Sequence, residues 1–211
     1  HLLSESKVYV HNSGLTIEKT VDKIRTTGIL EVNNIKSPET TIWFAKNKKS
    51  PKNNFCKRTK YLVKPIFGSQ GKNIFLVNNL YELKKIKATG EVFYLQKFIE
   101  TQEKEYTDVR VLVSNHRVIS SMERYSNHFI NNIFQGAKYR QIILKKNIKD
   151  LCIKLSKIFK LGYGGIDLKI TRNDVFVLEI NSVPSWKAMQ KISKINISEK
   201  LVEDFIKNIK K

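Results

Sequence analysis

The sequence predicts an α+β fold whose antiparallel sheets form two lobes that divide near residue 95. β-rich segments crowd the centre of the chain and follow one another as hairpins, without the intervening helices that a parallel sheet requires. Segments with helical spacing of apolar residues lie mainly toward the two ends. With 211 residues, 41% of them hydrophobic, the chain can bury a substantial core.

The N-terminal third is expected to combine a short strand with a helix. Residues 8–11 are apolar enough for a strand. Thr16 is a plausible N-cap for a helix that runs to about Asn33, and Pro38 closes this unit. The apolar residues of that helix recur with roughly helical spacing, at Ile17, Val21, Ile24 and Leu30.

The centre of the chain alternates strands with polar turns. A basic loop rich in Asn and Pro is expected at 47–58, a short helix at 80–88, and a polar, irregular segment at 126–141. The segments with strand composition are residues 40–46, 61–67, 73–77, 92–99, 108–114 and 117–125. The second and third of these are expected to pair as a hairpin, and so are the last two, across Asn115-His116.

The C-terminal part predicts a helix, a hairpin and two closing helices. The helix spans 147–160, and the sequence LGYGG breaks it. Strands follow at 165–171 and 175–181. After Pro184 come helices at 186–193 and 199–210, the second with Ser198 as its N-cap.

The chain is strongly basic, with a formal net charge of +20 and a pI near 9.9. Anionic metabolites, acidic lipid and nucleic acid are the partners that such a charge suggests. Its lysines are scattered apart from clusters at 46–60 and 207–211, which favours diffuse surface charge over a nucleic-acid face. We therefore expect neither nucleic acid nor a membrane as partner.

Cysteine usage and hydropathy favour a cytoplasmic protein. Cys56 and Cys152 lie far apart and form no CxxC motif. No apolar run approaches the ~20 residues that a membrane-spanning helix needs, and no signal-peptide pattern is present. The chain begins with His1 rather than Met, so we expect a processed or partial chain.

The hairpin at 164–181 contains the sharpest chemical signal. If Arg172-Asn173-Asp174 form its loop, Thr171 faces Val175, and Asp167 then lies opposite Glu179. The buried face would hold Ile166, Leu168, Ile170, Phe176, Leu178 and Ile180. The opposite face would hold Asp167, Glu179 and Asn181.

Two carboxylates and an amide oxygen at one end of a hairpin suit a hard cation such as Mg²⁺. The alternative interpretation is an ordinary solvated strand face, with Lys169 paired to a carboxylate. A loop one residue shorter would also break the pairing of Asp167 with Glu179. The sequence of this hairpin alone leaves both interpretations open.

The stretch LVKPIFGSQGKNIFLV at 62–77 indicates a phosphate-binding site. Gly68 and Gly71 would let backbone N–H groups approach phosphate oxygens closely. The stretch is not a P-loop, because its glycines are three apart and a strand follows. Lys64, inside the preceding strand, is therefore expected to contact phosphate and to be more important than Lys72.

Together these segments resemble the ATP-grasp superfamily and, more narrowly, the RimK-like carboxylate–amine ligases. The resemblance runs from about Asn12 to the C-terminus, and its motifs come in the family's order. They are TVDKIRT, LVKPIFGSQGKNI, YLQKFIE, DVRVLV, MERY, NNIFQGA, GIDL and LEINSVPSW.

The resemblance implies a nucleotide site and a metal site between two lobes. Lys23 and Lys64 would contact the phosphates of ATP, and Gly68, Ser69, Gln70 and Gly71 would form a flap over them. The adenine hinge would be Gln96, Lys97, Phe98 and Ile99, with backbone hydrogen bonds from Lys97 and Phe98. Asp108 would lie near the ribose, Asn132 near the phosphates, and Arg110 and Arg124 at the transferred phosphate and acyl group. The magnesium ligands would be Asp167, Glu179 and Asn181.

Three positions depart from the family pattern. Asn73 replaces the glycine that often follows the flap, and Pro184-Ser185-Trp186 replaces the usual PG after the metal motif. The segment FINN at 129–132 lacks the basic residue that RimK itself carries there. The segments SVPSWKAMQ and FINNIFQGA resemble a RimK-like subgroup associated with cofactor ligases, which argues against ribosomal-protein modification.

The resemblance also sets the expected domain organisation. Residues 1–39 would be a remnant of an N-terminal domain with a linking helix, residues 40–95 the small lobe with the flap, and residues 96–211 the large lobe with the metal site. The N-terminal domain that precedes the ATP-grasp core in family members would be largely absent.

The implied function is an ATP-dependent ligase that forms an amide bond through an acyl phosphate. It would add glutamate or a similar amino acid to a small-molecule, cofactor or peptide carboxylate. ATP and Mg²⁺ would be required, with two ions expected and Mn²⁺ as an alternative, and a homo-oligomer stays open. The competing hypothesis is a basic module that binds RNA or another polyanion and derives from an ATP-grasp fold.

Overall fold

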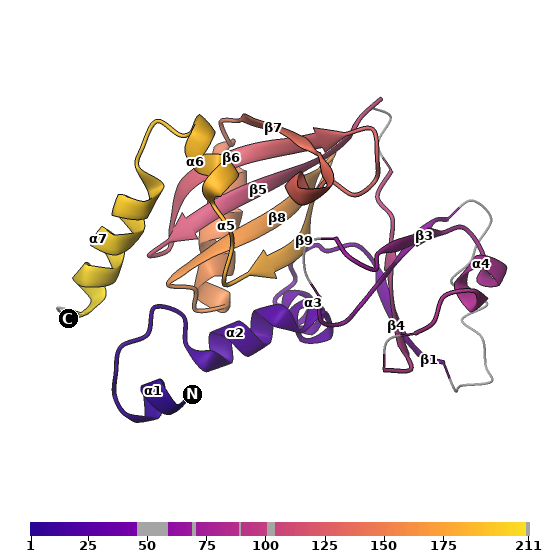
Figure 1. Ribbon diagram of the computed structural model, residues 1–211, viewed down its shortest axis with the longest axis horizontal. Coiled ribbons are helices and arrows are strands. Elements are labelled where there is room, and N and C mark those ends of the chain that lie inside the picture. The colour runs from indigo at the N-terminus through magenta and orange to yellow at the C-terminus, as the bar shows by residue number, and fades with distance from the viewer. Residues whose placement is uncertain (46–58, 69–70, 89, 101–103, 210–211) are drawn as a thin grey trace.

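Two antiparallel sheets side by side form the frame of the molecule (Figure 1). The computed structural model describes residues 1–45, 59–68, 71–88, 90–100 and 104–209. The smaller sheet has strand order β1-β4-β2-β3 and the larger has β7-β6-β5-β8-β9. The predicted α+β architecture with antiparallel sheets is confirmed. Within the ranges above, no helix combines the length and apolarity needed to cross a membrane.

The N-terminal region is helical, with α1 (Leu2–Glu5), α2 (Gly14–Val21) and α3 (Lys23–Val32). The single long helix predicted here is wrong, because Asp22 is extended and its carboxylate accepts from the N–H groups of Ile24 and Arg25. The N-cap of α2 is Ser13, not Thr16. Residues 8–11 form no strand.

The small lobe consists of β1 (Thr40–Phe44), β2 (Tyr61–Lys64), β3 (Phe75–Val77), α4 (Leu80–Lys84) and β4 (Val92–Lys97). The predicted hairpin of β2 with β3 is confirmed, with Leu62 opposite Leu76. Tyr61, Val63, Leu83 and Leu95 are among the buried side chains of its core. The basic loop predicted at 47–58 lies outside the described residues.

The large lobe contains β5 (Tyr106–Ser114), β6 (Arg117–Ser126), β7 (Lys138–Gln141), β8 (Tyr163–Ile170) and β9 (Val175–Asn181). Strand β7 was missed, because it lies at the sheet edge and its side chains are polar and mostly exposed. A 3₁₀ turn at Ile133–Gln135 precedes it. The hairpin of β5 with β6 is confirmed.

Alternation along β5 divides the large sheet into two faces. Val109, Val111 and Val113 face a core shared with α5 (Lys146–Ile158). Leu112 packs in a different cluster, with Met189 of α6 (Lys187–Ile192) and residues of α7 (Ile197–Ile209). Asp108 and Arg110 have the parity of Leu112, so they share its face.

The start of α7 corrects the predicted cap. Helix α7 begins at Ile197, and the side chain of Asn196 accepts from the N–H of Glu199 at 3.2 Å. Ser198 therefore lies inside the first turn of the helix, where its hydroxyl accepts from the indole N–H of Trp186 at 3.2 Å.

The β8–β9 hairpin pairs Asp167 with Glu179 as predicted, but by a different route. The turn is one residue longer than expected, since Ile170 rather than Thr171 pairs with Val175. A register shift between Asp167 and Leu168 then restores the predicted pairing.

The shift redistributes the side chains of β9. Val177 is buried at 1% exposure opposite Leu168, whereas Phe176 and Leu178, which were predicted to be buried, are only half-buried. The predicted burial of Phe176 and Leu178 is therefore wrong, because the pairing count assumed a ladder without a bulge.

The segment before α2 is attached to the large lobe through Asn12. Its side-chain amide donates to the carbonyls of Tyr163 and Ser182 at 2.8 and 2.7 Å, and it accepts from the N–H of Gly162 at 2.9 Å. A Cβ on Gly162 would overlap the carbonyl oxygen of His11. Only glycine permits this close approach of the two segments.

We expect Gly162→Ala to lower the free energy of unfolding by roughly 1–3 kcal/mol, because the methyl group displaces the N-terminal segment. Gly28→Ala is the matched control. Nothing lies within 4 Å of a Cβ at exposed Gly28 in α3, so alanine should stabilise by about 0.5–1 kcal/mol there. Urea denaturation of the two variants measures both effects. Equal stability changes would contradict the close-approach interpretation.

Candidate active site between the lobes

A cavity of about 500 Å³ opens between the two sheets. Leu62, Lys64 and the following loop line one side, and the face of the large sheet that carries Asp108 and Arg110 lines the other. The predicted site residues that line it are Lys23, Lys64, Gly68, Gly71, Asp108, Arg110, Arg124, Asn132, Asp167, Glu179 and Asn181. Ser69 and Gln70, predicted to belong to the flap, lie outside the described residues.

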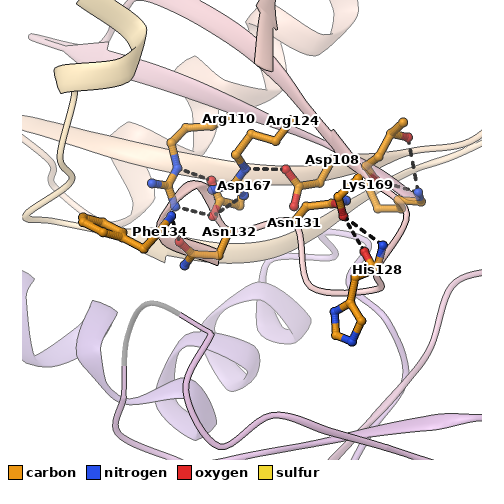
Figure 2. Close-up of polar contacts among 11 residues, drawn as sticks. Asp108, Arg110, Arg124, His128, Asn131, Asn132, Phe134, Asp167 and Lys169 are labelled. Atoms are coloured by element: carbon orange, nitrogen blue, oxygen red, sulfur yellow. Dashed lines mark hydrogen bonds and ion pairs between the residues drawn. The ribbon is translucent and has the colours of Figure 1, made fainter. Parts of the chain in front are cut away.

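A row of alternating charges forms the floor of the cavity (Figure 2). On strand β5, Asp108 lies directly opposite Arg124 of β6, and Arg110 directly opposite Asp167 of β8. Arg124 Nε donates to Asp108 Oδ1 at 2.6 Å, and Arg110 Nε and Nη2 donate to the two oxygens of Asp167 at 2.7 and 2.6 Å. Arg124 Nη2 also lies 3.0 Å from Asp167 Oδ2. The four side chains therefore form one continuous network.

Burial and mutual attraction set the protonation of this network. Burial raises the pKa of Asp108 to about 6, although Arg124 opposes this shift. Burial also disfavours ionised Asp167, but Arg110 and Arg124 outweigh it and hold the pKa of that carboxyl well below its usual range. Burial opposes the charge of Arg124, but Asp167 and Asp108 raise its pKa further. Arg124 of β6 is thus a permanent cation, bound by a carboxylate of the neighbouring strand β5 and by one of β8, the strand beyond it.

Lys64 lies across the cavity from this floor. Its Nζ donates to Gln96 Oε1 at 2.6 Å. Burial and the neighbouring charge of Lys23 lower the pKa of Lys64 to about 8, although Glu179 acts in the opposite direction. The side chain is therefore held in place and remains mostly cationic at neutral pH.

Lys23 connects the loop after β2 to the large sheet. Its Nζ donates to the carbonyl of Gly68 at 3.1 Å and lies 3.7 Å from Glu179 Oε1. The break at Asp22 makes Lys23 the first residue of α3, where its N–H also donates to the carbonyl of Ile66 at 3.3 Å.

The three predicted metal ligands offer a suitable donor set. Asp167 and Glu179 are paired directly across β8 and β9, and Asn181 follows on the same edge of the cavity. Two carboxylates and an amide oxygen are hard donors of the kind Mg²⁺ prefers. Both oxygens of Asp167 accept from arginine, and Asn181 Oδ1 accepts from the N–H of Val183 at 2.9 Å. Of the two carboxylates predicted to bind the metal, that of Glu179 belongs to the more exposed side chain, at 37% against 7% for Asp167.

The segment predicted to form the adenine hinge does not line the cavity. Gln96 is buried behind Lys64, where its amide also donates to the Tyr94 hydroxyl at 3.2 Å. The N–H of Lys97 donates to the carbonyl of Glu39, and that of Phe98 to the carbonyl of Lys60, both at 2.8 Å. Ile99 follows in the connection between the two sheets. The structure thus assigns Gln96 a contact with Lys64 that was not predicted.

The loop after β2 meets the large lobe at Gly71. This residue has φ +70, and a Cβ there would lie 2.7 Å from Ile130 Cγ2. Both facts require glycine at this position. Asn132, whose Cβ would lie 3.7 Å from a Cβ at Gly71, caps the 3₁₀ turn by accepting from the N–H of Phe134 at 2.8 Å. The predicted flap and the predicted phosphate segment are therefore neighbours.

Comparison with known proteins identifies the family. Residues 20–205 match the RimK-like ATP-grasp domain. The chain belongs to the RimK-like ATP-grasp family.

Its relatives include glutamate ligases of archaea and bacteria. The chain is 31% identical to the tetrahydromethanopterin:alpha-L-glutamate ligase of Methanocaldococcus jannaschii, over 92% of its own length and 69% of that protein's. It is 28% identical to the coenzyme gamma-F420-2:alpha-L-glutamate ligase of the same organism, with the same two shares. A probable alpha-L-glutamate ligase of Legionella pneumophila (strain Corby) is 26% identical, over 96% and 68%. Family membership classes this chain as an ATP-grasp ligase.

Solved structures show the same fold. The ATP-grasp ligase PsnB, complexed with the precursor peptide PsnA2 and AMPPNP, superimposes with a TM-score of 0.75 at 18% identity. The superposition includes 99% of this chain and 65% of PsnB. The D-alanine–D-alanine ligase of Bacillus anthracis complexed with ATP gives a TM-score of 0.75 at 15% identity, over 98% and 72%. The chain thus spans about two thirds of the length of these ATP-grasp ligases.

Sequence reasoning missed several residues of the ATP-grasp cavity. Leu178 lines it because of the bulge, which no residue pattern signalled. Tyr139 belongs to the missed strand β7. Lys187 and Lys191 of α6 line it as well, and their spacing of four within a predicted helix could have indicated a basic face.

We expect Asp108→Leu to lower the free energy of unfolding by about 1–3 kcal/mol, because Arg124 Nε loses its acceptor. Asp108→Asn should cost less, because an amide oxygen can still accept from Nε. Urea denaturation with circular dichroism compares the two variants. A leucine variant as stable as the wild type would show that Asp108 does not stabilise Arg124.

Proposed function

We propose that this chain is an ATP-dependent carboxylate–amine ligase that forms an amide bond through an acyl phosphate. The observation that carries the proposal is the position of Arg110 and Arg124. Both guanidinium groups are fixed by buried carboxylates on the cavity floor, facing a wall that holds Lys23 and Lys64. Such a cavity is suited to concentrating and holding anionic oxygens before, during and after phosphoryl transfer.

The nucleotide would lie between the two walls. Leu62, Ile74 and Leu178 line the cavity with apolar side chains that suit a flat base. Leu62 of β2 pairs with Gln96 of the neighbouring strand β4. The proposed hinge, Gln96 to Ile99, therefore begins one strand away from this apolar part of the cavity. Lys23 and Lys64 would bind the phosphates, with the 68–71 flap above them.

Asp167, Glu179 and Asn181 would hold Mg²⁺ beside those phosphates. When bound, the metal would supply Lewis-acid neutralisation of the phosphate charge. Asp167 would have to share its oxygens between the cation and the arginines, since these oxygens accept three contacts within 3.0 Å from guanidinium nitrogens. The number of ions and the use of Mn²⁺ belong to the same proposal.

The chemistry would proceed in two steps. An oxygen of the acceptor carboxylate attacks the γ-phosphorus of ATP, which gives an acyl phosphate and ADP. The amine nitrogen then attacks the acyl carbon, inorganic phosphate leaves, and the amine proton passes to phosphate or solvent. Arg110 and Arg124 would hold the acyl phosphate and the developing oxyanion. Asp108 would orient Arg124, and the flap, whose Gly71 lies beside Ile130, would limit hydrolysis by water.

Glutamate is the amino acid that we expect to be added. Two relatives are named as glutamate ligases that act on tetrahydromethanopterin and coenzyme gamma-F420-2. These names support an acceptor that is a small molecule, a cofactor or a peptide with a free carboxylate.

The proposal predicts multiple-turnover ADP release only when ATP, Mg²⁺, an amino acid and an acceptor carboxylate are supplied together. Asp167→Ala plus Glu179→Ala should reduce it to background, because the metal loses both carboxylates. Glu179→Gln alone is the safer variant, since Glu179 is more exposed than Asp167. Glu199→Gln, on exposed α7 surface, is the matched control.

Hydroxylamine should trap an acyl hydroxamate during turnover, and failure to trap one would contradict the acyl-phosphate route. The competing polyanion-binding function makes the opposite prediction. RNA oligonucleotide affinity would then fall steeply with salt and would survive the Asp167 and Glu179 substitutions.

Lys64→Ala should weaken ATP binding by about tenfold or more, and Lys72→Ala by less than about threefold, because Lys64 is partly buried whereas Lys72 is exposed. The affinity of the wild type should also fall as pH rises through the pKa of Lys64 at about 8, because the ammonium group loses its proton. Lys64→Arg should remove that pH step. Isothermal titration with ATP measures each effect, and a larger loss at Lys72 would reverse this ranking.

A further inference from the structure

The cavity extends beyond the charge row to one face of α6. Lys187, Ala188 and Lys191 line this end, and the two lysines lie one helical turn apart. The same helix is anchored by Met189, which is 1% exposed in a cluster with Leu112 and Met122. The anchored side fixes which face of α6 lines the cavity. Figure 1 shows α6 beside the β6 and β7 side of the large sheet.

Like the exposed Lys72, which also lines the cavity, these two lysines differ from the four cations that the protein holds in place. Lys23, Lys64, Arg110 and Arg124 each bind a carboxylate, an amide or a carbonyl. Among the described residues, Lys187 and Lys191 form no ion pair or hydrogen bond.

The carboxylates that line the cavity are already engaged elsewhere. Asp108 and Asp167 bind the arginines, and Glu179 lies near Lys23. The α6 end of the cavity thus carries positive charge that no lining carboxylate compensates. Such a surface favours an anionic ligand group.

The segment that leads into α6 lies beside the end of the charge row. A Cβ on Gly165 of β8 would be 3.0 Å from Pro184 and 3.9 Å from Arg110 Nε. Pro184 and Arg110 therefore flank the same small volume above Gly165. In Figure 2, Arg110 and Asp108 lie at opposite ends of the row of charges. A substrate held at Arg110 would thus have the α6 lysines next along the cavity.

We propose that Lys187 and Lys191 bind a second anionic group of the acceptor, a carboxylate or a phosphate remote from the carboxylate that reacts. This inference rests on the proposed function for the identity of the acceptor. The α-carboxylate of an incoming amino acid is two bonds from its reacting nitrogen, so it must lie close to Arg110 and Arg124. An acceptor has no such restriction, and its distal charge can reach α6.

Equilibrium binding tests the proposal on the full chain loaded with AMPPNP and Mg²⁺. The probes are N-acetylglutamine with one carboxylate, N-acetylglutamate with two, and N-acetyl-O-phosphoserine with a carboxylate and a phosphate. Isothermal titration should show about tenfold tighter binding of at least one probe with two anionic groups than of N-acetylglutamine. The stronger of these two probes identifies the second group as carboxylate or phosphate.

The Lys187→Gln/Lys191→Gln variant should lose this preference while binding N-acetylglutamine unchanged. Lys149→Gln/Lys154→Gln removes the same charge from exposed positions of α5, on the other face of the sheet, and should keep the preference. Two results would overturn the proposal. One is a wild type that binds neither of the probes with two anionic groups more tightly than N-acetylglutamine. The other is a preference that survives in the α6 variant as it does in the control.

Turnover separates this inference from the proposed function. With glutamate as amine, the α6 variant should raise the KM of the preferred acceptor about tenfold and leave the KM for ATP unchanged. A rise confined to the KM for glutamate would overturn the assignment to the acceptor. A lysine-dependent preference in the titrations without ADP release from any probe would instead count against the ligase reaction on these acceptors.

Discussion

The contact between Arg124 and its two carboxylates is the interaction on which the cavity depends. Arg124 is 7% exposed and binds Asp108 on one side and Asp167 on the other. Removing one partner from such a group leaves charge in a poorly solvated place, which is costly, whereas the intact network contributes little net stability. The role of the network is therefore to position side chains. It links strands β6, β5 and β8 through their charged side chains and fixes two guanidinium groups on the floor of the cavity.

The period-two alternation of strands explains why this polar floor coexists with a well-packed core. Val109 and Val111 point toward α5 and are at most 4% exposed, whereas Asp108 and Arg110 between them face the cavity. The bulge in β9 modifies the rule at one point. It buries Val177 and leaves Leu178 and Glu179, two consecutive residues, both lining the cavity. A regular strand would have sent one of them to the other face.

The opposite wall is organised by side chains that hold other side chains. Gln96 accepts from Lys64, and Lys23 spans from the Gly68 carbonyl to the neighbourhood of Glu179. These contacts fix cations in a partly buried site, where each would otherwise lose hydration without compensation. Lys187 and Lys191 have no such partners within the described part of the chain. That difference separates cations that are held by protein groups from the two lysines that we propose bind the acceptor.

The sequence by itself determined the class of the fold, the hairpins and most of the residues that meet in the cavity. Local patterns are enough for these features, because strand alternation and turn residues act over a few positions, and the motif order is recognisable without coordinates. The pairing of Asp167 with Glu179 was predicted through a turn one residue too short, compensated by an unforeseen bulge. Only the tertiary structure decided that Asp22 breaks the first helix, that Asp108 binds Arg124, that Gln96 binds Lys64 and that α6 closes one end of the cavity. The last three depend on contacts between separate strands, helices or lobes, which the composition of a single segment does not specify. The break at Asp22 is a local cap, in which its carboxylate accepts from the N–H groups of Ile24 and Arg25.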